Sequence, residues 1–319
     1  MDKSLVPFKA EVDFSVLISC YFEEKSIDEF YSRLSDVLQC MGRSYEIIFI
    51  NDGSTDKTFE KLKAIFDADP NVTAVVDLFK NAGQANAKTP GVLLARGKAI
   101  ILIDSDLQLD PEELPLLVDK YDEGFDVVSG YRKNRQDSLF RKLPSIIANA
   151  IMRKSSNSNL RDFGCTFKIY DGRLVRAFNF SPFKPWRPVP VISIARQIAE
   201  VSVSHHPRRF GQSGWTFKKL FAYNMENIVN LSERPFQILG MLCLALAFLF
   251  AIRVALGYVL PFSILPKVTS GLILNVIIIS LVVLLSVLAA IGEFIIRNFI
   301  LLQGKPAYII REIHTKNND

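Results

Sequence analysis

The sequence predicts an α/β domain with a mostly parallel sheet, followed by interfacial amphipathic helices and two C-terminal transmembrane helices. Short apolar runs alternate with segments of helical length as far as about residue 235, which is the pattern of βαβ units. One run, residues 100–103, is so dense in branched apolar residues that it indicates a strand buried on both faces. After about residue 235 the chain becomes strongly apolar, as membrane-spanning segments require.

Five apolar runs predict the strands of the sheet. They lie at residues 14–22, 46–51, 72–79, 100–103 and 126–131. Helices are expected between them, and a capping box of Ser26 and Glu29 opens the first. Asp110 and Pro111 match the N-cap and N1 positions of the helix that follows the fourth strand. We therefore assign Asp110 to a helix cap. The alternation of strands and helices also predicts helices on both faces of the sheet.

The fourth predicted strand ends at Asp104 and Asp106, two carboxylates that point the same way from a strand end. Ligands of open α/β sheets bind outside the carboxyl ends of the strands. Two neighbouring carboxylates repel each other unless a cation lies between or beside them, and hard oxygen ligands suit Mg2+ or Mn2+. The sequence therefore predicts a divalent metal site here. The alternative is that both residues only form a turn or cap a helix.

The second predicted strand also ends in polar residues, Asn51 to Ser54. Asp52 in this run can accept hydrogen bonds from a base or a ribose, although the same four residues are typical of an ordinary turn. Two familiar nucleotide-binding signatures are missing from the sequence. No GxGxxG follows the first strand, and GxxxxGK followed by Ser or Thr occurs nowhere. These observations argue against dinucleotide oxidoreductases and P-loop NTPases.

Basic residues gather beyond the fifth predicted strand. Residues 131–142 contain five of them, and apolar residues at helical spacing continue to residue 151. A second amphipathic stretch covers residues 216–231. Basic amphipathic helices of this kind lie in a membrane interface, while the alternative for each is ordinary packing against the sheet. The arginines of residues 161–166 and 205–213 are interpreted as anion binders, because the guanidinium group matches phosphate.

Two apolar segments, residues 236–260 and 268–296, are each long enough to span a bilayer. The link between them holds a single lysine, whereas basic residues flank the outer ends. The positive-inside rule then places both termini and the large first domain in the cytoplasm, which predicts a multi-pass protein of the inner (cytoplasmic) membrane. Residues 1–13 have no apolar core of signal-peptide length, so secretion of the first domain is not expected. The alternative for the two segments is a buried helical hairpin.

These features divide the 319-residue chain into four parts. They are a cytoplasmic domain at 1–215, an interfacial helix at 216–235, two transmembrane helices within 236–302 and a cytoplasmic tail at 303–319. The net charge of +5 is modest and no lysine-rich tail is present, so no nucleic-acid partner is expected. The four cysteines are scattered without CxxC spacing and are interpreted as reduced packing residues.

Several motifs occur in an order that resembles a known family. They are Tyr21-Phe22-Glu23-Glu24, Asn51-Asp52-Gly53-Ser54, Asp104-Ser105-Asp106-Leu107-Gln108, Arg141-Lys142-Leu143 with Ser145, Asp162-Phe163-Gly164-Cys165, the HxxRxxGxS pattern from His205 to Ser213, and Gly292-Glu293-Phe294. With the two apolar segments, they resemble the family-2 inverting glycosyltransferases of GT-A (Rossmann-like) fold, and within them the polyprenyl-phosphate glycosyltransferases. That group includes bacterial undecaprenyl-phosphate glucosyl and aminoarabinosyl transferases and dolichyl-phosphate mannose synthases. Phe22 and Trp215 depart from the pattern, since the family usually has Asn and Tyr at these positions.

The resemblance implies roles for individual residues. Glu23 and Asp52 would contact the nucleotide of the donor. Asp104, Asp106 and Gln108 would hold Mg2+ or Mn2+ against the donor diphosphate. The acceptor phosphate would be bound by Arg132, Arg141, Ser145 and Arg208. The resemblance further implies a UDP-sugar donor, with UDP-glucose expected, a polyprenyl phosphate acceptor such as undecaprenyl phosphate, and a homotetramer in the lipid bilayer.

The expected reaction is a direct displacement at the anomeric carbon of the sugar by a phosphate oxygen of the lipid. The metal on Asp106 would act as a Lewis acid on the leaving UDP. Asp162 is the candidate for a base or an orienting carboxylate, although a loop aspartate is also common in turns. Two other functions compete with this one: a processive membrane polysaccharide synthase with the same donor site, and a non-catalytic membrane scaffold.

Overall fold

A computed structural model of the chain describes residues 10–133, 160–210, 270–302 and 304–316, with isolated positions at 153, 158, 245, 248, 249, 252 and 256. It divides into two compact units, one formed by 1–231 with 306–319 and the other by 232–305. Several predictions lie outside the described residues. They concern Arg141, Ser145, Trp215, the amphipathic helices at 140–151 and 216–231, and the first apolar segment apart from the isolated positions.

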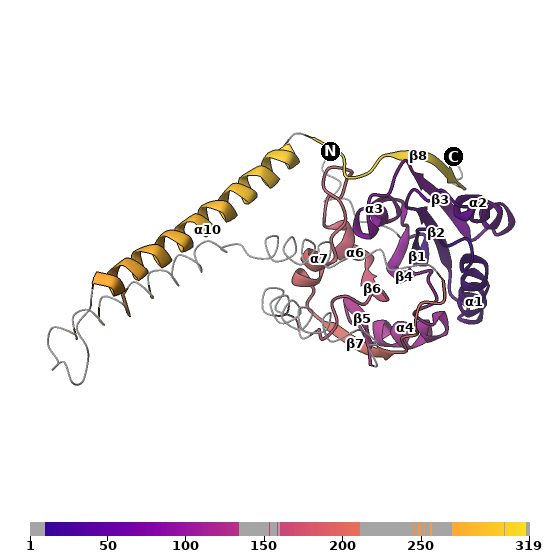
Figure 1. Ribbon diagram of the computed structural model, residues 1–319. Coiled ribbons are helices and arrows are strands. Elements are labelled where there is room, and N and C mark those ends of the chain that lie inside the picture. Colours follow the sequence, from indigo (N-terminus) through magenta and orange to yellow (C-terminus); the bar gives the residue numbers. More distant parts are fainter. Residues whose placement is uncertain are drawn as a thin grey trace. The chain divides into compact units, whose positions relative to one another are not determined.

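Within the described residues, the first unit is built on one eight-stranded sheet of order β7-β5-β6-β4-β1-β2-β3-β8 (Figure 1). The strands are β1 Val12–Cys20, β2 Tyr45–Asn51, β3 Val72–Leu78, β4 Gly97–Asp104, β5 Val127–Arg132, β6 Lys168–Asp171, β7 Ile198–Val203 and β8 Ile310–Thr315. The helices of this unit are α1 Ile27–Cys40, α2 Thr58–Ala68, α3 Gln84–Leu94, the 3-10 turn η2 Pro111–Glu113, α4 Leu114–Asp122, α6 Gly172–Arg176 and α7 Pro188–Ile194.

All five predicted strands are confirmed, as β1 to β5, with ends that differ by at most three residues. Strands β4, β1, β2 and β3 run parallel to one another, and β7 runs parallel to β5. The sheet is nevertheless mixed, because the four-residue strand β6 inserts antiparallel between β4 and β5. Strand β8 adds a second antiparallel edge beside β3. The prediction of an α/β sheet domain is therefore right in class and incomplete in topology.

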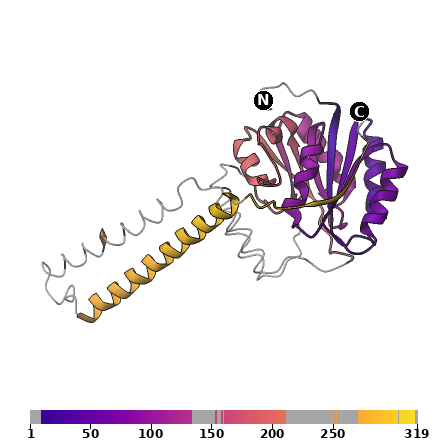
Figure 2. The ribbon, with the colours of Figure 1, turned by 90° about the horizontal axis from the view of Figure 1, so that it is seen from above.

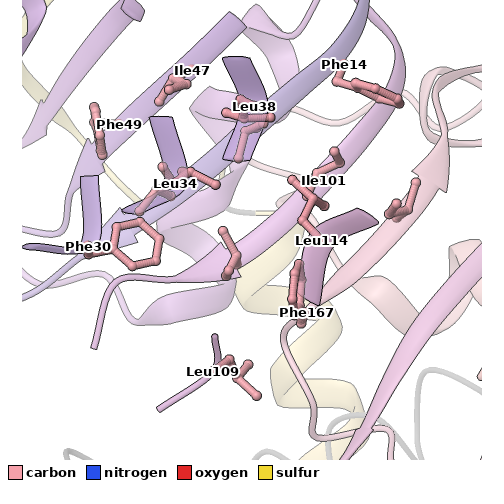
Figure 3. Packing of buried hydrophobic residues seen from close by; sticks show 14 of the residues in the cluster. Phe14, Phe30, Leu34, Leu38, Ile47, Phe49, Ile101, Leu109, Leu114 and Phe167 are labelled. Atoms are coloured by element: carbon pink, nitrogen blue, oxygen red, sulfur yellow. The ribbon is translucent and has the colours of Figure 1, made fainter. Parts of the chain in front are cut away.

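Helices cover both faces of the sheet, as predicted (Figure 2). Successive residues of β4 point to opposite faces, so Ile101 joins one buried cluster and Ile100 the other. The first cluster packs α1, α2 and α4, and Figure 3 shows Phe30 and Leu34 of α1 together with Leu114 among its side chains. The second cluster packs α3, α6 and α7. Each fully buried Leu, Ile or Phe stabilises the fold by roughly 1.5–3 kcal/mol, so the central strands are rigid supports for the loops at their carboxyl ends.

The two predicted helix caps are wrong in their bonding. Ser26 stands at the N-cap of α1, but its hydroxyl caps no backbone N–H and donates instead to the carboxylate of Glu23. Asp110 stands at the N-cap of η2, but its carboxylate accepts from Arg33 at 2.8 Å and lies 2.7 Å from Nε2 of His206. Asp110 thus pairs with the charged guanidinium of Arg33, Ser26 donates to a carboxylate three residues away, and neither side chain caps its helix.

The second unit contains the helix α10, Ser270–Leu302, which covers the second apolar segment. Among the residues whose side chains are described, no helix qualifies as long and apolar enough to cross a membrane. The two membrane spans and the cytoplasmic location stay predictions of the sequence.

The predicted C-terminal tail belongs to the sheet. Residues 310–315 form β8, which pairs antiparallel with β3. Tyr308 just before it is buried, and Ala307 donates from its N–H to the carbonyl of Pro182 at 2.8 Å. Lys316 at the far end donates to the carbonyl of Asp69 at 2.6 Å. The chain therefore returns to the first unit after the apolar segments and completes its sheet.

At the amino edge of the sheet, the buried carboxylate of Glu46 ties three strands together. It accepts from Ser15 Oγ of β1 at 2.5 Å and from Thr73 Oγ1 of β3 at 2.9 Å. Arg96, just before β4, donates to the same carboxylate from its backbone N–H at 2.6 Å and from Nε at 3.0 Å. Because Glu46 is only 1% exposed, each of these bonds replaces water that the carboxylate has lost.

We expect Glu46→Gln to lower the free energy of unfolding by about 2–4 kcal/mol, because it removes a buried charge partner of Arg96 and replaces one acceptor oxygen by an NH2 donor that faces other donors. Urea unfolding of the purified chain measures the change. Glu60→Gln on the exposed side of α2 is the matched control and should stay within about 0.5 kcal/mol of the parent chain. An equal response of the two variants would contradict this explanation.

Candidate active site

The carboxyl ends of the parallel strands bring the predicted donor residues to one edge of the sheet. In the register of β1, Cys20 lies opposite Asn51 of β2, and Ser19 lies opposite Asp104 of β4. The segments that come after these strands therefore start at the same level. They carry four of the predicted residues, Glu23, Asp52, Asp104 and Asp106.

Two side chains of helix α3 hold the carboxylate of Asp104 in place. Both of its carboxylate oxygens lie 2.7 Å from Nε2 of Gln84, and Nζ of Lys88 lies 3.2 Å from Oδ1. Burial alone would raise the pKa of Asp104, but the charge of Lys88, with hydrogen bonds from Thr166 and Gln84, brings it below the usual value. Asp104 is thus kept as a carboxylate. Sequence reasoning missed all three partners.

Asp106 makes the contact that joins the two halves of the predicted site. Its Oδ2 accepts from Nη2 of Arg208 at 2.6 Å, and its Oδ1 accepts from the backbone N–H of Gln108 at 3.1 Å. Burial and the nearby charge of Asp104 raise the pKa of Asp106, while Arg208 opposes that rise. Asp106 was predicted to face the donor and Arg208 the acceptor phosphate. The structure brings them together, although residues 106 and 208 are distant in the chain.

Gln108 fastens the segment that carries Arg208. Its Nε2 donates to the carbonyl of His206 at 3.2 Å, and the N–H of His206 donates to the carbonyl of Gln108 at 2.9 Å. Ser204 donates from its N–H to the carboxylate of Glu113 at 2.9 Å. With the His206–Asp110 contact, these bonds fix residues 204–208 along the 106–113 segment. The predicted role of Gln108 as a metal ligand stays a prediction.

Asp52 organises the loop between β3 and α3. It is 3% exposed, and its oxygens accept from the backbone N–H of Ala82 at 2.6 Å, the backbone N–H of Gly83 at 3.1 Å and Nδ2 of Asn81 at 2.9 Å. Burial raises the pKa of Asp52 to about 6 in spite of these bonds. Gly53 has φ +70° and sits against the backbone of Lys80, so close that a Cβ would come within 2.5 Å of it. The structure thus gives Asp52 a turn role, and its contact with a nucleotide stays a prediction.

Glu23 follows β1 and lies near the two aspartates of β4. Its backbone N–H donates to Oγ1 of Thr58 at 2.9 Å, and its carboxylate accepts from the hydroxyl of Ser26. Burial raises the pKa of Glu23 to about 7, and the charges of Asp106 and Asp104 add to the rise. The preceding Phe22 has φ +59°, a left-handed conformation that Asn adopts more readily than Phe. This is a physical reason for the Asn that the resembling family usually has there.

Asp162 and Arg132, predicted as base and as acceptor-phosphate residue, pair with each other. The guanidinium of Arg132 donates to the two oxygens of Asp162 at 2.7 and 2.9 Å, and the N–H of Gly164 donates to Oδ1 at 3.1 Å. Lys168 of β6 is buried and donates to the carbonyl of Cys165, and burial lowers its pKa. In this arrangement Asp162 orients Arg132, and its role as a base stays a prediction.

The carboxylates at this edge suit a divalent cation that a substrate phosphate also binds. In the described part of the chain, no three side chains from His, Cys, Asp and Glu come together as a metal-binding group. Mg2+ is commonly bound through one or two carboxylates together with substrate phosphates, so Asp104 and Asp106 are a sufficient protein share. Asp106 already accommodates a positive group, the guanidinium of Arg208. Gln108 would add an amide oxygen.

Comparisons with known proteins add independent findings. Residues 15–181 match the sequence model of the family described as glycosyl transferase family 2. An undecaprenyl-phosphate 4-deoxy-4-formamido-L-arabinose transferase from Klebsiella pneumoniae is 35% identical over 227 residues, which cover 71% of this chain and 69% of that protein. The transferase of the same name from Salmonella typhimurium is 35% identical over 258 residues, or 76% and 77% of the two chains.

A solved structure is similar in fold. It is glucosyl-3-phosphoglycerate synthase from Mycobacterium tuberculosis in complex with Mn2+, UDP and phosphoglyceric acid, with a TM-score of 0.50. The sequences are 18% identical, and the match covers 68% of this chain and 76% of that one. At this identity the likeness shows the shared α/β fold alone.

The raised pKa of Glu23 predicts a pH-dependent stability. Between pH 4.5 and about 7 the folded chain keeps a proton on Glu23 that the unfolded chain releases. The contribution of Glu23 to the free energy of unfolding therefore falls as the pH rises through this range, and it levels off above pH 7. The Glu23→Gln variant has no titrating group at this position. Its free energy of unfolding relative to that of the parent chain should therefore rise by up to about 3 kcal/mol from pH 4.5 to 8. Urea unfolding at several pH values in EDTA measures the difference, and a constant difference would contradict the prediction.

Proposed function

Because the chain belongs to glycosyl transferase family 2, we propose that this glycosyltransferase moves a sugar from a UDP-sugar to undecaprenyl phosphate or a related polyprenyl phosphate. The curated relatives support the acceptor, since they are named for undecaprenyl phosphate and match more than two thirds of this chain. The neighbouring structure that holds Mn2+ and UDP supports a UDP donor and a divalent cation, Mg2+ or Mn2+. The proposed location is the cytoplasmic face of the inner membrane.

The contact between Asp106 and Arg208 is the observation that carries the proposal. A glycosyl transfer to a phosphate needs a place for the leaving diphosphate and a place for the attacking phosphate, with the sugar between them. Asp106 belongs to the predicted donor side and Arg208 to the predicted acceptor side, and their side chains are 2.6 Å apart. An arginine can bind a phosphate through its fork of N–H groups, so the two sides adjoin as the reaction requires.

The side chains divide the work of the proposed reaction. A phosphate oxygen of the lipid bonds to the anomeric carbon, and the bond from that carbon to the UDP oxygen breaks. A divalent cation, when bound, stabilises the charge that develops on the leaving UDP. Lys88 and Gln84 hold Asp104 in place for this task. Arg208 and Arg132 position the acceptor phosphate, and Asp162 orients Arg132.

A strong base is less necessary for this acceptor than for a sugar hydroxyl. The lipid phosphate is already anionic near neutral pH, since a phosphate monoester has a second pKa of about 6. The bidentate pair of Asp162 with Arg132 agrees with a positioning task for this carboxylate. Positioning of the two reactants then supplies much of the rate.

The identity of the transferred sugar is the most specific point of the proposal. The sequence resemblance predicts glucose, whereas the curated relatives are named for 4-deoxy-4-formamido-L-arabinose. These relatives are the stronger argument, because they match this chain over most of its length. The formamido sugar is therefore the first donor to test, with UDP-glucose second.

Membrane attachment is part of the proposal because of the acceptor. Drawing a polyprenyl chain out of a bilayer costs about 0.8 kcal/mol for each CH2 group, so an enzyme must approach the headgroup at the membrane. The apolar segments predicted at 236–260 and 268–296 would hold the enzyme there. We also propose the homotetramer, which light scattering of the purified chain in detergent tests.

The decisive experiment supplies membranes that contain the chain with a panel of radiolabelled UDP-sugars and undecaprenyl phosphate, followed by lipid extraction. We expect one sugar in the lipid fraction, and none when undecaprenol replaces undecaprenyl phosphate. Asp106→Asn should lower transfer at least about a hundredfold, because the charge that serves the leaving group is lost. Asp119→Asn on the exposed side of α4 is the control and should retain transfer.

Each alternative function has its own outcome in this assay. Polymer without a lipid-linked single sugar would indicate a processive synthase. No incorporation with any donor would overturn the proposal and favour a scaffold.

A further inference from the structure

We propose that Arg311, on the C-terminal strand β8, is a positioning residue for the donor nucleotide. It would act by holding the end of β3 and the loop at residues 79–83 in the shape that the donor side of the site needs. The inference rests on the proposed function, since it takes a UDP-sugar as the donor. It concerns a part of the chain that lies beyond the apolar segments and outside the matched residues 15–181.

The start of β8 lies at the carboxyl end of β3, which is the edge where the donor residues gather (Figure 1). Ile310 pairs with Leu78 and Glu312 with Asp77. The N–H of Phe79 donates to the carbonyl of Ile309 at 2.8 Å. The C-terminal strand therefore continues past the end of β3 and borders the loop that comes after it.

Arg311 bonds to both the strand end and the loop. Its Nη2 donates to the carbonyl of Phe79 at 3.0 Å, and its Nη1 lies 3.4 Å from Oδ2 of Asp77. The Asp77 side chain is only 2% exposed, whereas that of Arg311 is 47% exposed. A buried carboxylate is costly without a cation, so the guanidinium is needed at this point and reaches it from the surface.

Asp77 links Arg311 to strand β2. Its Oδ1 accepts from Nδ2 of Asn51 at 2.7 Å, and Asn51 accepts from the N–H of Ser54 at 3.4 Å. Asp52, between them, holds Ala82 and the rest of the 81–83 loop. Arg311, Asp77 and the Asn51–Ser54 turn therefore form one connected network.

Loss of Arg311 would act on donor binding in particular. Without Arg311, the buried carboxylate of Asp77 would need water as a hydrogen-bond partner. The ends of β2 and β3 would have to shift to admit that water. On the acceptor side, Arg132 and Arg208 are held by Asp162 and Asp106, so this side should keep its affinity. A defect in positioning the nucleotide would weaken donor binding, with a smaller effect on kcat.

The test compares full-length Arg311→Gln with the parent chain in detergent. Titration calorimetry with UDP and Mn2+ gives the Kd, and initial rates give the KM of donor and acceptor. We expect the Kd for UDP and the donor KM to rise about tenfold, while the acceptor KM changes less than about twofold. Arg311→Lys should restore part of the affinity, because it returns the charge without the fork.

Lys316→Met is the matched control. Lys316 anchors the opposite end of β8 through the carbonyls of Phe66 and Asp69, at the amino edge of the sheet. This variant should lower the melting temperature by loosening the same strand, yet leave the Kd for UDP unchanged. The double variant Asp77→Asn with Arg311→Gln removes the stranded charge and should bind UDP more tightly than Arg311→Gln alone.

The outcomes separate this inference from the proposed function. If the parent chain binds UDP and Arg311→Gln binds it equally well, the inference fails and the proposed function stands. A loss of affinity as large in Lys316→Met as in Arg311→Gln would also overturn it, since β8 would then act only through stability. Failure of the parent chain to bind UDP would overturn the proposed function and this inference with it.

Discussion

The structure depends on the neutralisation of carboxylates that are crowded at one edge of a sheet. Removal of such groups from water costs several kcal/mol each unless a cation or several N–H donors replace the lost hydration. The described residues meet this demand differently at each position. The pairs are Asp104 with Lys88, Asp106 with Arg208, Asp162 with Arg132 and Asp77 with Arg311. Asp52 instead accepts from two backbone N–H groups and from the side-chain amide of Asn81. These contacts connect α3, the 204–208 segment and β8 to the edge.

The carboxylates at this edge differ in how far nearby charges and hydrogen bonds offset the effect of burial on their pKa. Asp104 stays ionised beside Lys88, whereas burial raises the pKa of Asp52 to about 6 and that of Glu23 to about 7. The charge of the edge is therefore sensitive to the ligands that bind there. Near neutral pH, a cation close to Glu23 would favour loss of its proton and an anion would favour its retention. Groups with shifted pKa values are common at functional sites, which agrees with the position of this edge.

The sequence was informative wherever a pattern is local. The apolar runs predict β1 to β5, and the acids that end β2 and β4 identify the edge, because strand ends can be recognised from short runs of residues. Strand β6 escaped notice because it is four residues long and comes after a polar loop, and its antiparallel insertion depends on its neighbours in space. The cap at Asp110 was wrong because the distant Arg33 pairs with its side chain, whereas the hydroxyl of Ser26 donates to the neighbouring carboxylate of Glu23.

Cationic partners were the least predictable part of the site. Lys88 lies inside a helix and is an ordinary helix residue by sequence, yet it is buried against Asp104. Arg311 comes from a segment that was predicted to be a tail. An ion pair between residues far apart in the chain leaves no trace in local composition, since its geometry arises only when the strands align. Arg208 was predicted as an anion binder from its residue type and as an acceptor-phosphate residue through the family resemblance, and no local pattern linked it to Asp106.

Arginine has a specific advantage at position 208. A guanidinium carries five N–H donors in a planar fork, and Nη2 of Arg208 donates to Asp106 at 2.6 Å. A lysine would offer a point charge, which a carboxylate and a phosphate would have to share without defined geometry. With arginine, the carboxylate fixes the plane of the group, and the remaining donors face directions set by that plane. The contact with Asp106 therefore orients the guanidinium of Arg208 relative to the end of β4. Under the proposed function, the geometry of the donor side would then determine where an acceptor phosphate binds.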